Sequence, residues 1–172
     1  MLDVEASGFG RHSYPIELGY VLPDGRSFCT LIRPAEDWTH WDASAEAMHH
    51  IPREAACRHG RPPREVATLL NDQLRGLVLY SDGWAHDYAW LGALYEEAGM
   101  QPSFKLDNLR ALLDDEQAAH WHAAKDIVMQ EMPNQRHRAS SDAKRLQLTV
   151  MRVRGDASMA AGANDPSPAA RP

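Results

Sequence analysis

The sequence is poor in cysteine and has no long apolar run. Its two cysteines, Cys29 and Cys57, stand far apart and form no Cys-x-x-Cys pair. That spacing argues against a zinc knuckle or a disulfide framework and favours a reducing compartment, so we expect a cytoplasmic protein. No apolar stretch reaches the length of about eighteen residues that a membrane span needs. The first residues also lack the basic and apolar regions of a secretory signal.

Basic residues are scarce as well. Lys and Arg number 18 against 24 Asp and Glu, which gives a net charge of −6. Nucleic-acid binders are more often basic, so the global charge counts mildly against such a partner. Bound divalent cations would nevertheless supply positive charge locally.

The length of 172 residues favours a single domain. From Gly155 onward the chain is rich in Ala, Gly, Ser and Pro and shows no apolar periodicity, which is typical of disorder. We therefore expect one folded domain over residues 1–154 and a disordered tail over residues 155–172.

Apolar periodicity predicts an α/β protein. Residues 15–22 and 27–33 read as strands, and Asp24-Gly25 between them is a strong hairpin signal. Together with the opening residues they predict a three-stranded antiparallel meander. Short strands are also expected over 77–80 and 104–106, and helices over 44–51 with Ser44 as N-cap, 63–75 closed by Gly76, 84–98, most of 108–132, and 139–154.

Two carboxylates stand two residues apart in the opening apolar stretch. In a strand, Asp3 and Glu5 would lie side by side on one face while Leu2 and Val4 point the other way. The like charges repel each other, and a cation between them would remove the repulsion. Carboxylate oxygens suit hard cations such as Mg²⁺ or Mn²⁺. The alternative is an edge strand with a solvated polar face.

Two further aspartates fall on apolar helix faces. At about 100° per residue, Asp87 and Asp142 lie within the apolar stripes of the helices predicted over 84–98 and 139–154. An unpaired carboxylate on a buried face is costly, so each needs a partner or a metal ion. The alternative for either is a capping or ion-paired residue near a helix start, where the dipole favours negative charge.

His137 stands five residues before Asp142, too far round a helix to share its face, and is expected in a loop. Histidine titrates in the right range to take a proton from water. Two cations about 4 Å apart can hold the attacking water and the leaving oxygen of an in-line displacement. Four carboxylates and one mobile base therefore indicate phosphodiester hydrolysis.

These residues stand in three motifs whose order resembles the DEDDh branch of the DnaQ-like (ribonuclease T and proofreading-type) 3′–5′ exonucleases. LDVEASG at residues 2–8 resembles the first motif, DYAWL at 87–91 the second, and HRASSDA at 137–143 the third. PIELG at 15–19 and AEAMHHI at 45–51 are similar to the family's text between motifs. The resemblance covers roughly residues 1–153.

The resemblance implies a ribonuclease-H-like α/β fold, with a central mixed sheet whose three N-terminal strands are antiparallel and which is flanked by helices. It implies two ions, Mg²⁺ or Mn²⁺, with His137 as general base and release of nucleoside 5′-monophosphates from single-stranded RNA or DNA 3′ ends. The implied metal ligands, which are also the catalytic carboxylates, are Asp3, Glu5, Asp87 and Asp142. The partner would be a nucleic-acid 3′ end rather than a membrane, and some relatives form homodimers.

Two side chains are candidates for substrate binding. Phe9 follows the first motif beside a glycine and could stack on a base. Arg138 lies within the third motif and could meet a phosphate.

The chain departs from the family pattern in two places. Only Met1 and Leu2 precede Asp3, which makes the first strand short, and the second motif reads SDGWAHD, so that Asp82 rivals Asp87. A second hypothesis is therefore a nucleic-acid-binding or accessory module with the same fold and little catalysis. A third is hydrolysis of a nucleotide or another phosphodiester.

Overall fold

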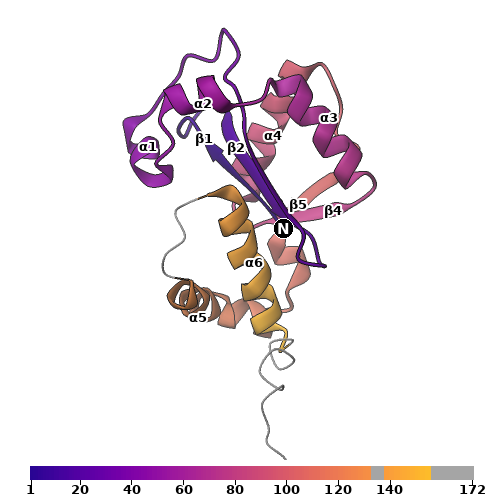
Figure 1. Ribbon diagram of the computed structural model, residues 1–172. Helices are drawn as coiled ribbons and strands as arrows, with labels where there is room; N and C mark the ends of the chain where they lie inside the picture. Colours follow the sequence, from indigo (N-terminus) through magenta and orange to yellow (C-terminus); the bar gives the residue numbers. More distant parts are fainter. Residues whose placement is uncertain (133–137, 156–172) are drawn as a thin grey trace, which may run out of the picture.

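The computed structural model describes residues 1–132 and 138–155, and it combines short strands with helices (Figure 1). Both His137 and almost all of the tail predicted to be disordered lie outside these residues. In chain order the elements are β1 (Leu2–Ala6), β2 (Pro15–Val21), β3 (Ser27–Leu31), α1 (Ala43–His49), α2 (Arg53–His59), α3 (Pro63–Leu74), β4 (Val78–Ser81), α4 (Trp84–Ala98), β5 (Lys105–Asn108), the 3₁₀ helix η1 (Leu109–Leu112), α5 (Asp115–Glu131) and α6 (Ala139–Val153).

The first three strands form the expected antiparallel meander, in the order β1-β2-β3. Gly25 takes a positive φ of 85° in the β2–β3 turn, which confirms the Asp-Gly hairpin. The register sets Asp3 opposite Gly19, and Glu5 opposite Glu17. These residues share one face of the sheet, because residues directly opposite in an antiparallel pair point the same way.

The expectation of one central mixed sheet is corrected by the hydrogen bonding. β4 and β5 form a separate parallel pair, although β4 lies beside β1. The odd-numbered residues of β1 hydrogen-bond toward β2, so the even-numbered ones present their backbone toward β4. There the N–H of Val4 bonds to the carboxylate of Asp87. The Asp87 carboxylate thus takes the Val4 N–H group that would otherwise hydrogen-bond to β4 in a continuous sheet.

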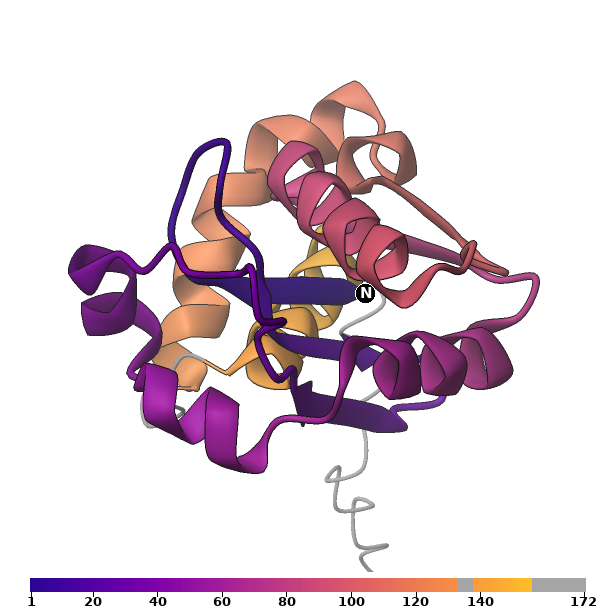
Figure 2. The ribbon, with the colours of Figure 1, turned by 90° about the horizontal axis from the view of Figure 1, so that it is seen from above.

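Helices cover both faces of the meander. In Figure 2, α3 and α4 lie on the near side of the strands, with α4 toward β1, and α6 lies behind them. Leu2 and Val4 face α3 and α4 in the main core, together with buried residues such as Leu70 and Leu94. The opposite face, which carries Asp3 and Glu5, is covered by α6.

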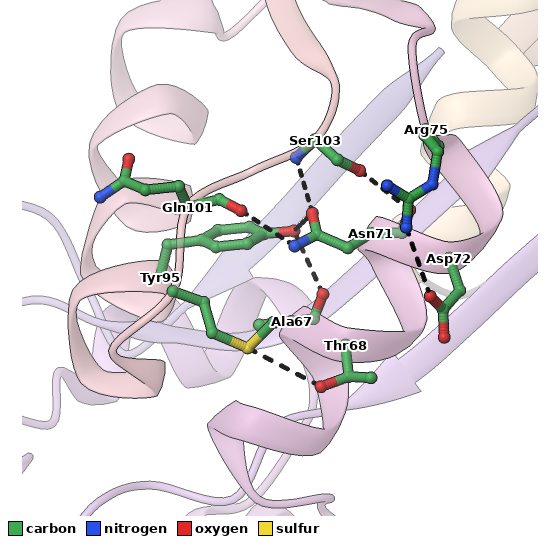
Figure 3. Close-up of polar contacts among 9 residues, drawn as sticks. Ala67, Thr68, Asn71, Asp72, Arg75, Tyr95, Gln101 and Ser103 are labelled. Atoms are coloured by element: carbon green, nitrogen blue, oxygen red, sulfur yellow. Dashed lines mark hydrogen bonds and ion pairs between the residues drawn. The ribbon is translucent and has the colours of Figure 1, made fainter.

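A polar network joins α3 to α4 and to the segment after it (Figure 3). The Oδ1 atom of Asn71 accepts hydrogen bonds from the Tyr95 hydroxyl at 2.9 Å and from the Ser103 backbone N–H at 2.7 Å. Its amide nitrogen donates to the Gln101 carbonyl at 2.9 Å. Because one side chain satisfies three partners, α4 is fixed at the end remote from Asp87.

Two predicted elements are wrong in detail. Asp42, not Ser44, caps α1, because its carboxylate accepts the Ser44 backbone N–H at 2.8 Å. The segment 108–132 is mostly helical, as expected, but it contains two separate helices, η1 and α5, and α5 starts after Asp114 in a capping box with Gln117. No helix within residues 1–132 and 138–155 is both long enough and apolar enough to cross a membrane.

Candidate functional site

Three of the four predicted carboxylates converge between β1 and α6. Asp3, Glu5 and Asp142 each offer an oxygen, and these oxygens lie within 4.8 Å of one another. All three residues are partly buried. Residues from the two ends of the folded chain therefore supply one acidic cluster.

Gly19 lets α6 approach the sheet closely enough to form this cluster. A Cβ atom at Gly19 would lie 2.1 Å from the backbone nitrogen of Ser140 and 2.4 Å from the carbonyl carbon of Ala139. Backbone atoms cannot swing away as a flexible side chain could, so only glycine fits. Since Gly19 pairs with Asp3, this contact seats the first turn of α6, which carries Asp142, over the β1 carboxylates.

Glu17 fixes the start of α6. Its side chain is fully buried, and it accepts hydrogen bonds from the Nε atom of Arg138 at 2.6 Å and from the backbone N–H of Ala139 at 2.9 Å. The Glu17 carboxylate therefore accepts a backbone hydrogen bond at the N-terminus of α6 and also pairs with the guanidinium group of Arg138. The sequence analysis did not predict this role. A glutamate within the otherwise apolar strand PIELG could have indicated a buried, paired carboxylate.

Arg138 was expected to meet substrate, but the structure directs it toward Glu17. We expect Arg138→Met to lower the free energy of unfolding by about 2 kcal/mol, less than for a wholly buried pair because Arg138 is half exposed. The loss arises because Glu17 would stay buried without its cation. Urea unfolding measures it, with Arg138→Lys as the matched control that keeps the charge. Unchanged stability together with weakened oligonucleotide binding would instead support the original expectation.

Asp142 is held by its own helix. Arg145, which is buried, donates from Nη1 to Oδ1 of Asp142 at 2.6 Å. The Nη2 atom of Arg145 also lies 3.4 Å from the carbonyl oxygen of Met132, just past the end of α5. The arginine thus links the last turn of α5 to the carboxylate and restricts its orientation.

Asp87 stands beside the cluster. Its side chain is buried at the start of α4, and it accepts a hydrogen bond from the hydroxyl of Ser81 at the end of β4. Asp82 is placed differently, since it pairs with Lys125 of α5 at 2.6 Å and is partly exposed. Asp87 lines the same pocket as Asp3 and Glu5, so its position agrees with the choice of Asp87 over Asp82.

Burial, together with neighbouring negative charge, raises the pKa of Asp3, Glu5 and Asp87. Burial and then the negative charges of Asp87, Glu5 and Asp142 raise the pKa of Asp3 well above its ordinary value. Burial and the charge of Asp142 raise the pKa of Glu5 to about 7. Burial likewise raises the pKa of Asp87 to about 7, although the hydrogen bond from Ser81 opposes the shift. The cluster therefore holds more negative charge than its surroundings stabilise, which suits a divalent cation.

A pocket of about 190 Å³ opens beside the acidic cluster. Asp3, Glu5 and Asp87 form its charged side, while Phe9, Met48 and Trp90 contribute an apolar side. Phe9 is 56% exposed. Its ring centroid lies 5.4 Å from that of His86 and 5.9 Å from that of Trp90. The pocket can therefore hold a flat apolar group next to a cluster of carboxylates.

Among the histidines at this site, His49 also lines the pocket. It is buried, and its Nδ1 atom accepts the backbone N–H of Ile51 at 3.0 Å, which indicates a role in shaping the α1–α2 connection. His137, the predicted general base, falls in the undescribed segment that precedes Arg138 and α6. Its position relative to the carboxylates therefore stays a prediction.

Comparison with models of known protein families gives no match for this chain. Comparison with curated protein sequences gives none either.

Proposed function

We propose that this protein is a two-metal-dependent 3′–5′ exonuclease of the DEDDh type, acting on single-stranded RNA or DNA ends. The observation that carries the proposal is the convergence of Asp3, Glu5 and Asp142, beside buried Asp87, at a pocket with an apolar wall. An aromatic and apolar wall next to a hard-cation site fits a terminal nucleotide, whose base is flat and whose phosphate is anionic.

In the proposed reaction, different residues would bind the metal ions, position the terminal base and accept the proton of the attacking water. Asp3, Glu5, Asp87 and Asp142 would hold two Mg²⁺ or Mn²⁺ ions, and bound ions of this kind would lower the pKa of water and neutralise charge on the phosphate. Phe9 packs against the terminal base and orients the scissile phosphate toward the carboxylates. His137 would take the proton from the attacking water as its oxygen bonds to phosphorus. The bond from phosphorus to the 3′-oxygen of the preceding nucleotide breaks, that oxygen takes a proton from solvent, and the terminal nucleotide is released as a nucleoside 5′-monophosphate.

The same proposal includes a ribonuclease-H-like fold. It is supported by the three-stranded antiparallel meander, by the parallel β4–β5 pair that lies beside β1, and by helices on both faces. The carboxylates of β1 then lie between the meander and the β4–β5 pair, where α4 and α6 can each add one aspartate.

Metal ions are expected to stabilise the protein more at high pH. The raised pKa values of Glu5 and Asp87 mean that the folded state keeps protons that the unfolded chain loses as the pH rises from about 4.5 to about 7. Stability without metal therefore falls across this window. Cations bind the ionised carboxylates, so the rise in melting temperature with Mn²⁺ should be larger at about pH 8 than at about pH 5.5. A rise that is equal at both pH values would contradict a metal site at this cluster.

The function itself is tested with 5′-labelled single-stranded RNA and its DNA counterpart in Mg²⁺ or Mn²⁺, beside Asp142→Asn. A ladder that shortens from the 3′ end and is absent with the variant supports the proposal and identifies the preferred sugar. Binding without cleavage would favour the accessory module, and cleavage of mononucleotide esters alone would favour a nucleotide hydrolase.

A further inference from the structure

A second hollow of about 510 Å³ lies next to the loop that carries Phe9. Arg11 and His12 of that loop line it on one side, and Thr39 and His40 of the segment before α1 line it on the other. Arginine guanidinium and threonine hydroxyl groups are among the side chains that contact phosphate oxygens in nucleic-acid complexes, and a protonated histidine can donate a charge-assisted hydrogen bond to phosphate.

The cationic side of this hollow carries hydrogen-bond donors that no other described residue of the protein uses. Arg11 and His12 are exposed, and neither side chain forms a hydrogen bond or ion pair within the part of the chain that the structure describes. His40 contacts the Ser7 hydroxyl with Nδ1 at 3.4 Å.

One loop separates this hollow from the pocket beside the carboxylates. Gly8 lines that pocket, and a Cβ atom on it would lie 2.7 Å from the Cε1 atom of His40. Trp90 also lines that pocket, and its Nε1 donates at 2.8 Å to the hydroxyl of Ser13, which lines the hollow. The two cavities therefore share a wall that is one loop thick and is anchored to α4.

We infer that this hollow binds the phosphate backbone of the single strand, upstream of the terminal nucleotide held at the carboxylates. The inference rests on the proposed function for the identity of the strand. A strand whose 3′ end enters the first pocket past Phe9 would cross the loop and present its next phosphates to Arg11 and His12.

Asp37 allows a test of whether the charge of the hollow, rather than the shape of the loop, determines strand binding. It contributes a carboxylate to the same lining, where it would repel a phosphate backbone. Removing its charge should therefore strengthen binding, whereas removing the charge of Arg11 should weaken it. A merely structural effect on the loop would weaken binding in both cases.

The test measures binding of a fluorescent 12-nucleotide single strand by anisotropy in EDTA, at several salt concentrations. We expect Arg11→Gln and His12→Ala to weaken binding roughly three- to tenfold, and Arg11→Gln to reduce the salt slope by about one. Asp37→Asn should tighten it by a similar factor. Binding of a dinucleotide, which has one phosphodiester, should be unchanged. Arg75→Gln is the matched control, because Arg75 is an exposed arginine at the end of α3 (Figure 3).

The outcomes separate this inference from the proposed function. No binding of the 12-nucleotide strand by the unchanged protein, or equal binding by all variants, overturns the inference. Cleavage in Mg²⁺ is recorded with the same proteins. Charge-dependent binding without cleavage overturns the exonuclease and supports the hollow as a strand-binding surface, whereas cleavage with no dependence on Arg11 overturns the hollow alone.

Discussion

Replacing Asp3 by asparagine is expected to abolish Mg²⁺-dependent cleavage while making the metal-free protein more stable above neutral pH. Asp3 lies centrally, since Asp87, Glu5 and Asp142 all raise its pKa. The loss of activity should reach at least about a thousandfold, because a metal site supplies several kcal/mol of transition-state stabilisation.

The gain in stability follows from the same charges. A buried carboxylate with a raised pKa costs stability once the pH exceeds the value at which the folded state releases its proton. Asparagine has nearly the same shape and no charge, so thermal unfolding at about pH 8 should shift upward by roughly 3 °C, the effect of about 1 kcal/mol in a domain of this size. At about pH 5 the two proteins should differ little.

Asp82→Asn is the matched control for Asp3→Asn. Asp82 is also an aspartate close to the cluster, but it is partly exposed and paired with Lys125. We expect it to retain most of the activity. Full activity of Asp3→Asn would contradict the assignment of the cluster. Loss of activity in Asp82→Asn would move the second-motif role from Asp87 to Asp82.

Replacing Gly19 by valine should have the largest effect on the fold. The added side chain would overlap backbone atoms of Ala139 and Ser140, so α6 would have to move off the sheet. Overpacking without room to relax should lower the free energy of unfolding by more than about 3 kcal/mol. Activity should fall with it, because Asp142 would no longer lie over Asp3.

Gly92→Ala is the comparison within the same chain. Gly92 lies inside α4, and a Cβ atom there meets nothing within 4 Å. Alanine in a helix interior should therefore stabilise the protein by roughly 0.5–1 kcal/mol. Urea unfolding of both variants measures the contrast. Similar stability of Gly19→Val and the unchanged protein would show that α6 does not dock on Gly19.

The elements that local sequence determines were predicted well. The hairpin at Asp24-Gly25 and the helix over Trp84–Ala98 are confirmed, the latter with the same bounds. Both depend on short-range signals, namely a turn dipeptide and an apolar stripe at helical spacing. For the same reason Asp87 could be placed on the buried face of its helix before its partners were known.

The contacts that assemble the cluster could not be predicted from local pattern. Glu17 bonds to Ala139, 122 residues later, and Gly19 contacts the next residue of the same helix. Periodicity gives the face on which a residue lies but not the element that packs on it. The division of residues 108–132 was missed because a capping aspartate, Asp114, falls within a stretch of otherwise ordinary helix formers.

Binding of Mn²⁺, measured by calorimetry in the presence of a nucleoside 5′-monophosphate, tests most directly whether these carboxylates form a two-metal site. We predict that the unchanged protein binds two ions with release of protons, and that Asp3→Asn binds fewer and more weakly. Absence of binding at millimolar Mn²⁺, or equal binding by the variant, would contradict the assignment.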